Sequence, residues 1–322
     1  LGYGRDDLTK QAQDKLRDIF EAPDAEVHFV ITGTAANALA LATVAQPWQA
    51  IFCHHEAHVQ VSEANAPEFF SGGAKMLGVA GPSGKIDPKA LINAIEDFES
   101  GGVKEVQRGP VALTQVTDLG AVYTLAELRA LTKIAKSYGL PVHLDGARFA
   151  NALVSLDCTP AEMSWKSGVD ILSFGGTKNG CMGVEAVILF DPGQAREFQL
   201  RRMRGGHLVS KNRFLAAQML AYLTDNLWLD LARRSNAAAQ KLEAAIPALP
   251  GGMLYHKPEA NMLFAGWTRQ GHRNAQRAGA SYYLGHRETL DGPPDQVIAG
   301  RLVCNWATSE QDIADFLRAA NG

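Results

Sequence analysis

Two stretches, His143-Leu-Asp-Gly-Ala-Arg148 and Ser173-Phe-Gly-Gly-Thr-Lys178, decide how the rest of the chain is interpreted. Each follows or contains a short apolar run of the kind that forms a strand buried between helices. Polar side chains gather where each run ends. In open α/β sheets, ligands bind outside the carboxyl ends of the strands, so we expect Asp145, Arg148 and Lys178 to face one crevice.

An acid and a lysine that meet in such a crevice suggest a cofactor chemistry. Pyridoxal phosphate forms a Schiff base with a lysine and is accompanied by an acidic partner for its pyridine nitrogen. Lys178 and Asp145 are suited to these two tasks. The plainer interpretation of Lys178 is a solvated loop lysine, but its place after an apolar strand, with glycines on both sides, favours a functional one.

The composition is that of an ordinary globular enzyme. The chain has 322 residues, 46% of them hydrophobic, and a net charge of −3 without a basic block, so we predict no nucleic-acid or anionic-membrane surface. The four cysteines lack CxxC spacing, and no apolar run approaches the ~18 residues of a membrane span. We expect a cytoplasmic enzyme that acts on a small molecule. Because the chain opens on Leu1, we expect further residues before it, and a targeting peptide there stays open.

Strand and helix patterns alternate through residue 190. Apolar strand runs over 27–32, 50–53 and 111–116 are separated by helical patterns over 33–43, 87–96 and 124–138. This order predicts a mainly parallel, doubly wound sheet, with a hairpin over 180–190 that returns to it. The remainder has an α+β pattern. We therefore predict a large domain over 1–213 and a smaller α+β domain over 214–322, whose first element is a linking helix over 214–229.

Four polar residues stand where helical patterns begin and are predicted to cap them. They are Thr9, Asp87, Thr124 and Ser309. Side-chain oxygens at such positions accept hydrogen bonds from the unpaired first N–H groups of a helix.

The junction at Gly33-Thr34-Ala35 joins an apolar strand to a helix rich in alanine and leucine. A helix N-terminus presents free N–H groups, and a glycine lets a phosphate approach the backbone closely. No Gly-Lys-Ser/Thr sequence follows, so the junction is not a Walker A loop. Ordinary helix capping is the alternative interpretation.

Three histidines in His54-His-Glu-Ala-His58 suggest a metal site, because His54 and His58 could share a helical face. There is no HExxH motif and no obvious third ligand, so we predict no metal. A histidine beside the crevice could instead stack on a cofactor ring or move a proton.

Arginines stand out at two further places in the sequence. Arg301 begins an apolar strand, where a cation is better explained by an anionic partner than by exposure. Arg196, Arg201, Arg202 and Arg204 cluster on one helical segment, and a solvated helix face is the simplest explanation for them.

These motifs together resemble a known family. The stretch His143-Leu-Asp-Gly-Ala-Arg-Phe-Ala-Asn151 and the lysine segment are similar to those of the low-specificity L-threonine aldolases and phenylserine aldolases, within the fold-type-I pyridoxal-phosphate enzymes. The similarity covers almost the whole chain, through Tyr3-Gly-Arg-Asp-Asp7, Gly33-Thr-Ala-Ala-Asn37, Glu56-Ala-His58, Asn261-Met-Leu-Phe264 and Arg301-Leu-Val303.

The resemblance implies a role for each matching residue. Lys178 would form the Schiff base, Asp145 would pair with the pyridine nitrogen, and His58 would lie against the cofactor ring. The phosphate would be held by Gly33, Thr34 and Ala35. The substrate carboxylate would be bound by Arg148 and Arg301, for which a planar guanidinium is suited. A family serine that also binds this carboxylate would precede Leu1.

The chain departs from the family at one place. Many members carry Thr-His-Asn after the strand that corresponds to 111–116, and their histidine is near the substrate. Here the run is Gln115-Val-Thr-Asp118, without a histidine, as in the phenylserine-aldolase branch. The base that takes the β-hydroxyl proton is left open between His58 and a bound water.

The resemblance implies retro-aldol cleavage of L-β-hydroxy-α-amino acids such as threonine, allo-threonine and phenylserine to glycine and an aldehyde. It also implies a homodimer or homotetramer with shared active sites, in which the arginines at 201–204 would reach a neighbour's phosphate. The alternatives are a β-eliminating lyase or aminotransferase of the same fold and, from another class, a non-catalytic binding protein.

Overall fold

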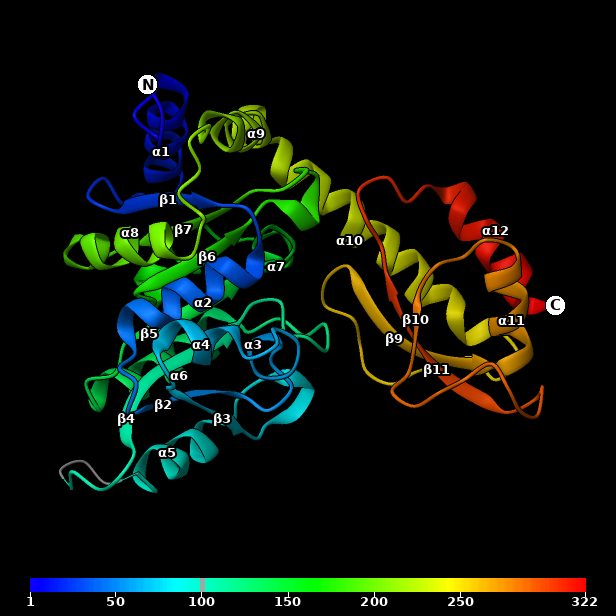
Figure 1. Cartoon of the computed structure of the whole chain (residues 1–322). Helices are drawn as coiled ribbons and strands as arrows, with labels where there is room; N and C mark the ends of the chain where they lie inside the picture. Colours follow the sequence, from blue (N-terminus) through cyan, green and yellow to red (C-terminus); the bar gives the residue numbers. More distant parts are fainter. Residues whose placement is uncertain (99–101) are drawn as a thin grey trace.

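A seven-stranded sheet forms the centre of the larger part of the molecule, in a computed structural model that describes residues 1–98 and 102–322 (Figure 1). Its strand order is β1-β7-β6-β5-β4-β2-β3. The strands are β1 (Glu26–Val30), β2 (Gln49–His54), β3 (Lys75–Val79), β4 (Gln107–Thr114), β5 (Val142–Gly146), β6 (Ile171–Gly175) and β7 (Glu185–Leu189). Strands β3, β2, β4, β5 and β6 are parallel, whereas β7 runs antiparallel to both β6 and β1. The predicted mainly parallel sheet and the hairpin into β7 are confirmed.

Helices cover both faces of this sheet, because alternate strand residues point to opposite sides. In β6, Leu172 and Phe174 join one hydrophobic core, while Ile171 joins another on the opposite face. The helices of this part are α1 (Asp7–Ile19), α2 (Gly33–Val44), α3 (His58–Val61), α4 (Ala66–Ser71), α5 (Pro88–Glu96), α6 (Leu125–Ser137), α7 (Phe149–Leu156), α8 (Ala195–Arg204) and α9 (Arg213–Leu223). Short 3-10 turns lie at Pro82–Gly84, Trp165–Ser167, Thr177–Asn179 and Pro192–Gln194.

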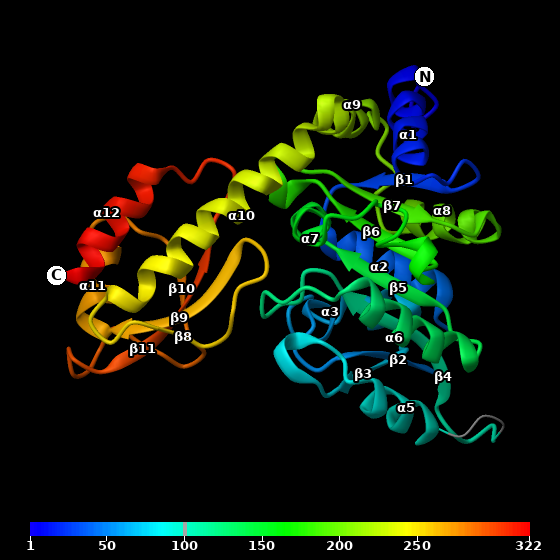
Figure 2. The ribbon, with the colours of Figure 1, turned by 180° about the vertical axis from the view of Figure 1, so that it is seen from behind.

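A second, four-stranded antiparallel sheet of order β10-β11-β9-β8 forms the smaller part. It consists of β8 (Met253–Leu254), β9 (Met262–Thr268), β10 (Tyr283–Leu284) and β11 (Val297–Val303), with α11 (Arg269–Arg277), α12 (Glu310–Asn321) and the 3-10 turn Ile246–Ala248. Its core is separate and includes the buried Trp267. Figures 1 and 2 show the long helix α10 (Leu227–Ala245) running from the large part to the small one.

The predicted continuous linking helix over 214–229 is wrong. The structure divides it into α9 and α10 at the 3-10 turn Thr224–Asn226, where Asp225 and Asn226 have φ of 51° and 58°. Asp and Asn adopt this left-handed conformation more readily than most residues, and the surrounding apolar run hid the break. Ala232 of α10 belongs to the large core and Ala238 to the small one, so α10 makes the link. The domain boundary after residue 213 stays a prediction.

The helix starts follow most of the capping predictions. Asp87, Thr124 and Ser309 each accept a backbone N–H bond at the start of α5, α6 and α12. The prediction for Thr9 is wrong, because Asp6 caps α1 and accepts the N–H of Thr9 at 3.0 Å. The helix begins within the polar Asp6-Asp7 pair, one turn earlier than its apolar stripe indicates.

The carboxyl ends of the central strands are aligned. Thr114 of β4 pairs with Asp145 of β5, which pairs with Ser173 of β6. A side chain at Gly175 would collide with the backbone of Ala147, so the absence of one lets the ends of β5 and β6 approach closely. In the described part of the chain, no helix has the length and apolar character needed to cross a membrane.

Candidate active site

The charged groups of the site lie at or just after the ends of neighbouring strands. Asp118 follows β4, Asp145 lies in β5, Arg148 precedes α7, and Lys178 lies in the 3-10 turn after β6. Because these strands are parallel and adjacent, the four side chains emerge at the same edge of the sheet. Asp145, Arg148 and Lys178, which we expected to lie together, therefore form a cluster of interacting charges.

The backbone around Lys178 is anchored by its neighbour. The side-chain amide of Asn179 donates to the hydroxyl of Tyr222 at 2.7 Å and to the carbonyl of Trp228 at 2.8 Å. Asn179, Tyr222 and Trp228 are all buried, which fixes the turn against α9 and α10. The backbone that carries Lys178 is therefore held in place, while Lys178 itself remains exposed to solvent.

The surroundings of Lys178 as a whole favour its neutral amine. The surrounding protein removes hydration from the ammonium group and Arg148 repels it, so the pKa of Lys178 is lowered, although Asp145, Asp118 and Glu185 oppose this change. Burial raises the pKa of Glu185 to about 7, and its carboxyl accepts the N–H of Gly176 at 2.7 Å. A lysine with a lowered pKa is a better nucleophile near neutral pH.

Asp145 is a buried carboxylate, 4% exposed, whose two oxygens have fixed donors. Its Oδ1 accepts the N–H of Ala147 at 2.9 Å, and its Oδ2 accepts the amide Nδ2 of Asn37 at 3.0 Å. These bonds orient the carboxylate. Among the described residues, no cationic side chain lies within ion-pair distance of it.

A connected set of buried side chains joins Asp145 to His58, and no motif of the sequence predicts it as a unit. Asn37 also donates to Oε1 of Glu63 at 2.9 Å, and the same oxygen lies 2.8 Å from Nδ1 of His58. The Glu63 side chain is fully buried, whereas that of His58 is 38% exposed. The hydrogen bond to the Glu63 carboxylate is the largest cause of the raised His58 pKa. Asn37 lies within the matched Gly33–Asn37 motif, but nothing in the sequence signals its contact with Glu63.

Arg148 and Arg301 approach each other from different parts of the chain. Burial and, to a smaller extent, the positive charge of Arg301 lower the pKa of Arg148 to about 10. Within residues 1–98 and 102–322, the Nε of Arg148 is buried without a hydrogen-bond partner, and the Nε of Arg301 contacts the sulfur of Met262 at 3.0 Å. Among the described residues neither guanidinium forms an ion pair with a carboxylate. Two adjacent cations with unused donors are suited to a bound carboxylate.

The predicted phosphate site lies at the first turn of α2. Thr32 caps this helix and accepts the N–H of Ala35 at 3.2 Å, so that one of the three predicted residues already uses its donor. The first N–H groups of a helix, here those of Gly33 and Thr34, have no partner within it. No atom of the described part of the chain lies within 4 Å of the position that a side chain on Gly33 would occupy, which leaves room for an anion.

The three neighbouring histidines point to different partners. His54 Nε2 lies 3.0 Å from the carbonyl of Gly81, His55 is exposed, and His58 contacts Glu63. The described residues contain no group of three metal-ligand side chains that could hold an ion.

The arginine cluster on α8 is only partly a solvated face. Arg196 and Arg204 are exposed as predicted, but Arg202 is 5% exposed and donates to Oδ1 of Asn212 at 2.7 Å. The prediction is wrong for Arg202 because the helix turns it toward the interior. Arg201 is half-buried and donates to Glu197 and to the carbonyl of Phe70.

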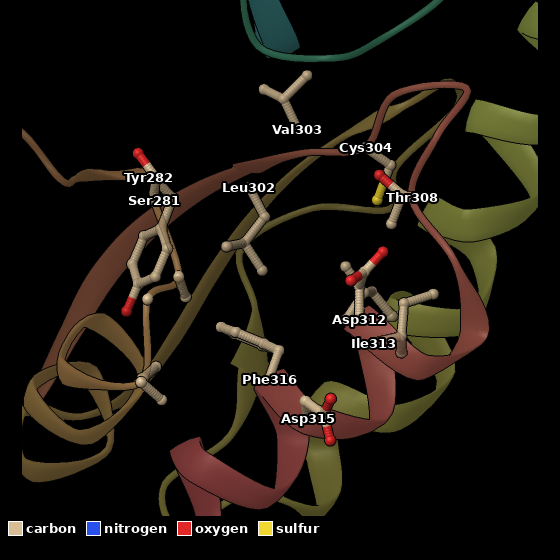
Figure 3. Close-up of a pocket in the computed structure, with 15 residues that line it drawn as sticks. Ser281, Tyr282, Leu302, Val303, Cys304, Thr308, Asp312, Ile313, Asp315 and Phe316 are labelled. Atoms are coloured by element: carbon tan, nitrogen blue, oxygen red, sulfur yellow. The ribbon is translucent and has the colours of Figure 1, made fainter.

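A separate cavity lies in the smaller part of the molecule (Figure 3). Its lining includes Tyr282, Leu302, Asp312 and Phe316, and it contains none of the residues predicted for the site. The cavity is therefore distinct from the charge cluster at the sheet edge.

Comparison with known proteins identifies the family. The profile of the β-eliminating lyase family matches residues 2–268. The chain is 37% identical over 314 residues to a low specificity L-threonine aldolase of a Pseudomonas species, which covers 98% of this chain and 87% of that protein. The chain belongs to this family. A second low specificity L-threonine aldolase, of Pseudomonas aeruginosa, is 38% identical over 316 residues, with 98% and 88% covered.

The family assignment is matched by the fold. A solved structure of Leishmania major threonine aldolase superposes with a TM-score of 0.90 at 28% identity, covering 99% of this chain and 90% of that one. The predicted fold-type-I architecture and the resemblance to L-threonine aldolases are confirmed. The predicted cofactor, pyridoxal phosphate, agrees with this family of lyases.

The site residues fit pyridoxal phosphate in their chemistry. An accessible amine with a lowered pKa, Lys178, suits the aldehyde, and the buried carboxylate of Asp145 suits a protonated ring nitrogen. The open space at Gly33 suits the phosphate. The unused donor of Arg148 leaves a place for the carboxylate of an amino acid.

Proposed function

We propose that this protein is a pyridoxal-phosphate-dependent aldolase that cleaves L-β-hydroxy-α-amino acids to glycine and an aldehyde. The proposal is supported by the near full-length similarity to L-threonine aldolases. The observation that carries it is the meeting of Lys178, Asp145, Arg148 and Arg301 at one edge of the sheet. Threonine, allo-threonine and phenylserine are the substrates we expect.

Each residue of the site has a proposed task. Lys178 would hold the cofactor covalently, Gly33, Thr34 and Ala35 would bind its phosphate, and His58 would lie against its ring. When bound, pyridoxal phosphate supplies an electron-poor ring that withdraws the electron pair released at the substrate α-carbon. Asp145 would keep the ring nitrogen protonated, because a negative charge beside a base favours its charged form.

Arg148 and Arg301 would bind the substrate carboxylate. Each still has N–H donors available, and their mutual repulsion is relieved when an anion lies between them. This anchoring would hold the α-carbon near Lys178 and direct the β-hydroxyl toward the remaining acidic groups of the site.

Product analysis tests the proposal. The purified protein with pyridoxal phosphate is expected to convert threonine and phenylserine to glycine plus acetaldehyde or benzaldehyde. A keto acid plus ammonia would favour a β-eliminating lyase, an amino-group transfer to a keto acid would favour an aminotransferase, and no binding of the cofactor would favour a non-catalytic protein. Borohydride reduction followed by peptide mapping should place the label on Lys178, and a label on another lysine would contradict that assignment.

We also propose a homo-oligomer, dimer or tetramer, in the cytoplasm, with active sites shared between subunits. The arginines at 201–204 would then approach a neighbouring subunit's cofactor phosphate. Sedimentation of the active enzyme as a monomer would contradict this arrangement.

A further inference from the structure

Asp118 is an acidic side chain at the centre of the site to which the proposed function gives no task. It lies after β4, beside the strand that carries Asp145, and its Oδ2 accepts the backbone N–H of His58 at 2.9 Å. Asp145, His58 and Lys178 act electrostatically on its carboxyl group, and Asp118 in turn acts on Arg148. The carboxylate therefore stands among the groups that would hold the cofactor and the substrate carboxylate.

The environment makes Asp118 a stronger base than an exposed aspartate. Burial is the largest cause of its raised pKa, and the negative charge of Asp145 adds to it. The N–H of His58 and the positive charges of His58 and Lys178 oppose this rise. A carboxylate with a higher pKa takes a proton more readily, which is what general-base catalysis requires.

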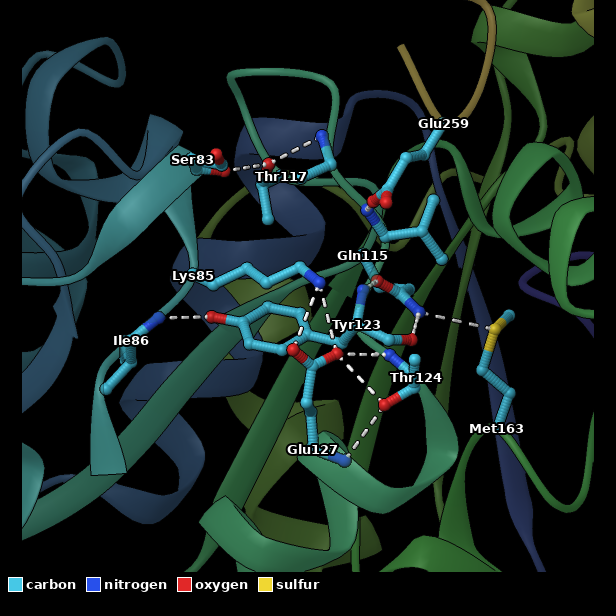
Figure 4. Close-up of polar contacts among 12 residues, drawn as sticks. Ser83, Lys85, Ile86, Gln115, Thr117, Tyr123, Thr124, Glu127, Met163 and Glu259 are labelled. Carbon is cyan, nitrogen blue, oxygen red and sulfur yellow. Dashed lines mark hydrogen bonds and ion pairs between the residues drawn. The ribbon is translucent and has the colours of Figure 1, made fainter. Parts of the chain in front are cut away.

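The loop that carries Asp118 is held firmly from within. The side chain of Gln115 accepts the N–H of Tyr123 and donates to its carbonyl, each at 2.9 Å, which closes the loop at its base. The hydroxyl of Thr117 donates to the carbonyl of Ser83 at 2.8 Å and accepts the N–H of Ala121 at 3.0 Å (Figure 4). These bonds fix the backbone immediately beside Asp118.

The smaller part of the molecule holds the same loop from the other side. Glu259 Oε2 accepts the N–H of Val122 at 2.6 Å (Figure 4), and His256 contacts the carbonyl of Leu119. The N–H of Glu259 donates to the carbonyl of Gly120 at 3.3 Å. A side chain that takes part in catalysis must be held in a fixed position, whereas an aspartate that is merely solvated in a loop need not be.

His58 is less suited to accept a proton. Its Nδ1 is paired with the buried carboxylate of Glu63, which raises the pKa of His58 and favours the imidazolium form. An imidazolium has no free lone pair. The anionic form of Asp118, by contrast, is an acceptor without prior protonation.

We propose that Asp118 is the catalytic residue that takes the proton of the substrate β-hydroxyl during cleavage. This inference rests on the proposed aldolase function. As the O–H bond breaks, its proton passes to the Asp118 carboxylate and its electron pair forms the carbonyl of the aldehyde. The Cα–Cβ bond breaks and its pair remains on Cα. Cα then takes up one proton and Asp118 releases one, so the reaction consumes none.

The test compares two reactions of the holoenzyme, of which only one involves a β-hydroxyl. Asp118→Asn retains an oxygen that can accept the His58 N–H. We expect this variant to cleave threonine and phenylserine at least about 100-fold more slowly, within the usual range for removal of a general base. Exchange of the glycine α-proton with D2O, followed by NMR, should stay within a few-fold of the wild type, because glycine has no hydroxyl. Asp118→Ser, which keeps a hydroxyl acceptor but no carboxylate, should behave in the same way.

The pH dependence gives a second measurement. Cleavage by the wild type, as kcat/KM, should fall as the pH falls through the pKa of Asp118, because only the carboxylate accepts a proton. This acid limb should be absent from the residual activity of Asp118→Asn.

Unchanged cleavage in both variants, or equal loss of cleavage and exchange, would overturn the assignment. A shift of the acid limb to lower pH in Glu63→Gln, with the limb retained in Asp118→Asn, would assign the proton to His58 instead. A wild type that exchanges glycine protons but forms no aldehyde would contradict the proposed function itself.

Discussion

The side-chain amide of Asn37 donates to two buried carboxylates at once, 3.0 Å from Oδ2 of Asp145 and 2.9 Å from Oε1 of Glu63. One NH2 group therefore connects the acid proposed for the cofactor ring with the acid that holds His58. Since both carboxylates are buried, each depends on this donor for part of its hydrogen bonding.

Replacement of Asn37 by Ala should destabilise the protein. Removing the amide leaves two buried acceptors each without one donor, so we expect the free energy of unfolding to fall by at least about 2 kcal/mol. Urea unfolding measures this change. Asn93→Ala, at an exposed position of α5, is the matched control and should change stability by less than about 0.5 kcal/mol. Equal effects of the two substitutions would show that the bonds of Asn37 contribute little.

Replacement of Glu63 by Gln should lower the pKa of His58. The carboxylate of Glu63 stabilises the imidazolium, and a neutral amide does so less, so the ring of His58 should lose its proton at a lower pH than in the wild type. NMR titration of the ring protons follows this directly. Glu56→Gln, which alters an exposed acid near His55, should leave the His58 titration unchanged. An unaltered His58 in Glu63→Gln would refute the coupling.

Replacement of Asp145 by Ala should separate cofactor binding from catalysis. Lys178 remains to hold pyridoxal phosphate, so its absorbance should persist. Cleavage should decrease by roughly 100-fold or more, because a preorganised charge beside the ring is lost. Stopped assays of glycine formation provide the measurement, and Asp24→Ala, at an exposed site, is the control. Full cleavage activity in Asp145→Ala would contradict the proposed role.

The break between α9 and α10 can be tested through backbone conformation alone. Asn226 is exposed and has φ of 58°, a conformation that a β-branched residue adopts at a cost of about 1–2 kcal/mol. We expect Asn226→Val to reduce the unfolding free energy by about that amount in urea titrations. Asn226→Gly should not, because glycine occupies the left-handed region freely. Comparable loss in both variants would point to a lost side-chain contact instead.

Much of the large part of the molecule could be predicted from local patterns. Buried parallel strands give continuous apolar runs, and the helices between them give their own periodicity, so the order from Val27 to Phe190 was apparent. Lys178, Asp145 and Arg148 could be placed because they follow or end such strands. The break at Asp225-Asn226 was missed because apolar residues on both sides continue a helical pattern across it.

The connections among distant residues could not be predicted in the same way. Asn37 and Glu63 are far apart in the sequence from Asp145, and a buried amide has no signature that names its partners. Asp118 appeared only as the place where an expected histidine was absent. Its contact with the backbone of His58 arises from the tertiary packing of α3 against the loop after β4.

Met262, the first residue of β9, contacts both ends of the proposed substrate-binding region. Its sulfur meets the Nε of Arg301 at 3.0 Å, and its carbonyl lies so near Gly120 that a side chain there would approach within 3.0 Å. Met262 therefore lies between Arg301 and the loop that carries Asp118. In the proposed reaction, Arg301 would bind the substrate carboxylate and Asp118 the β-hydroxyl, two groups that all β-hydroxy amino acids share. Neither residue would select the group beyond the β-carbon.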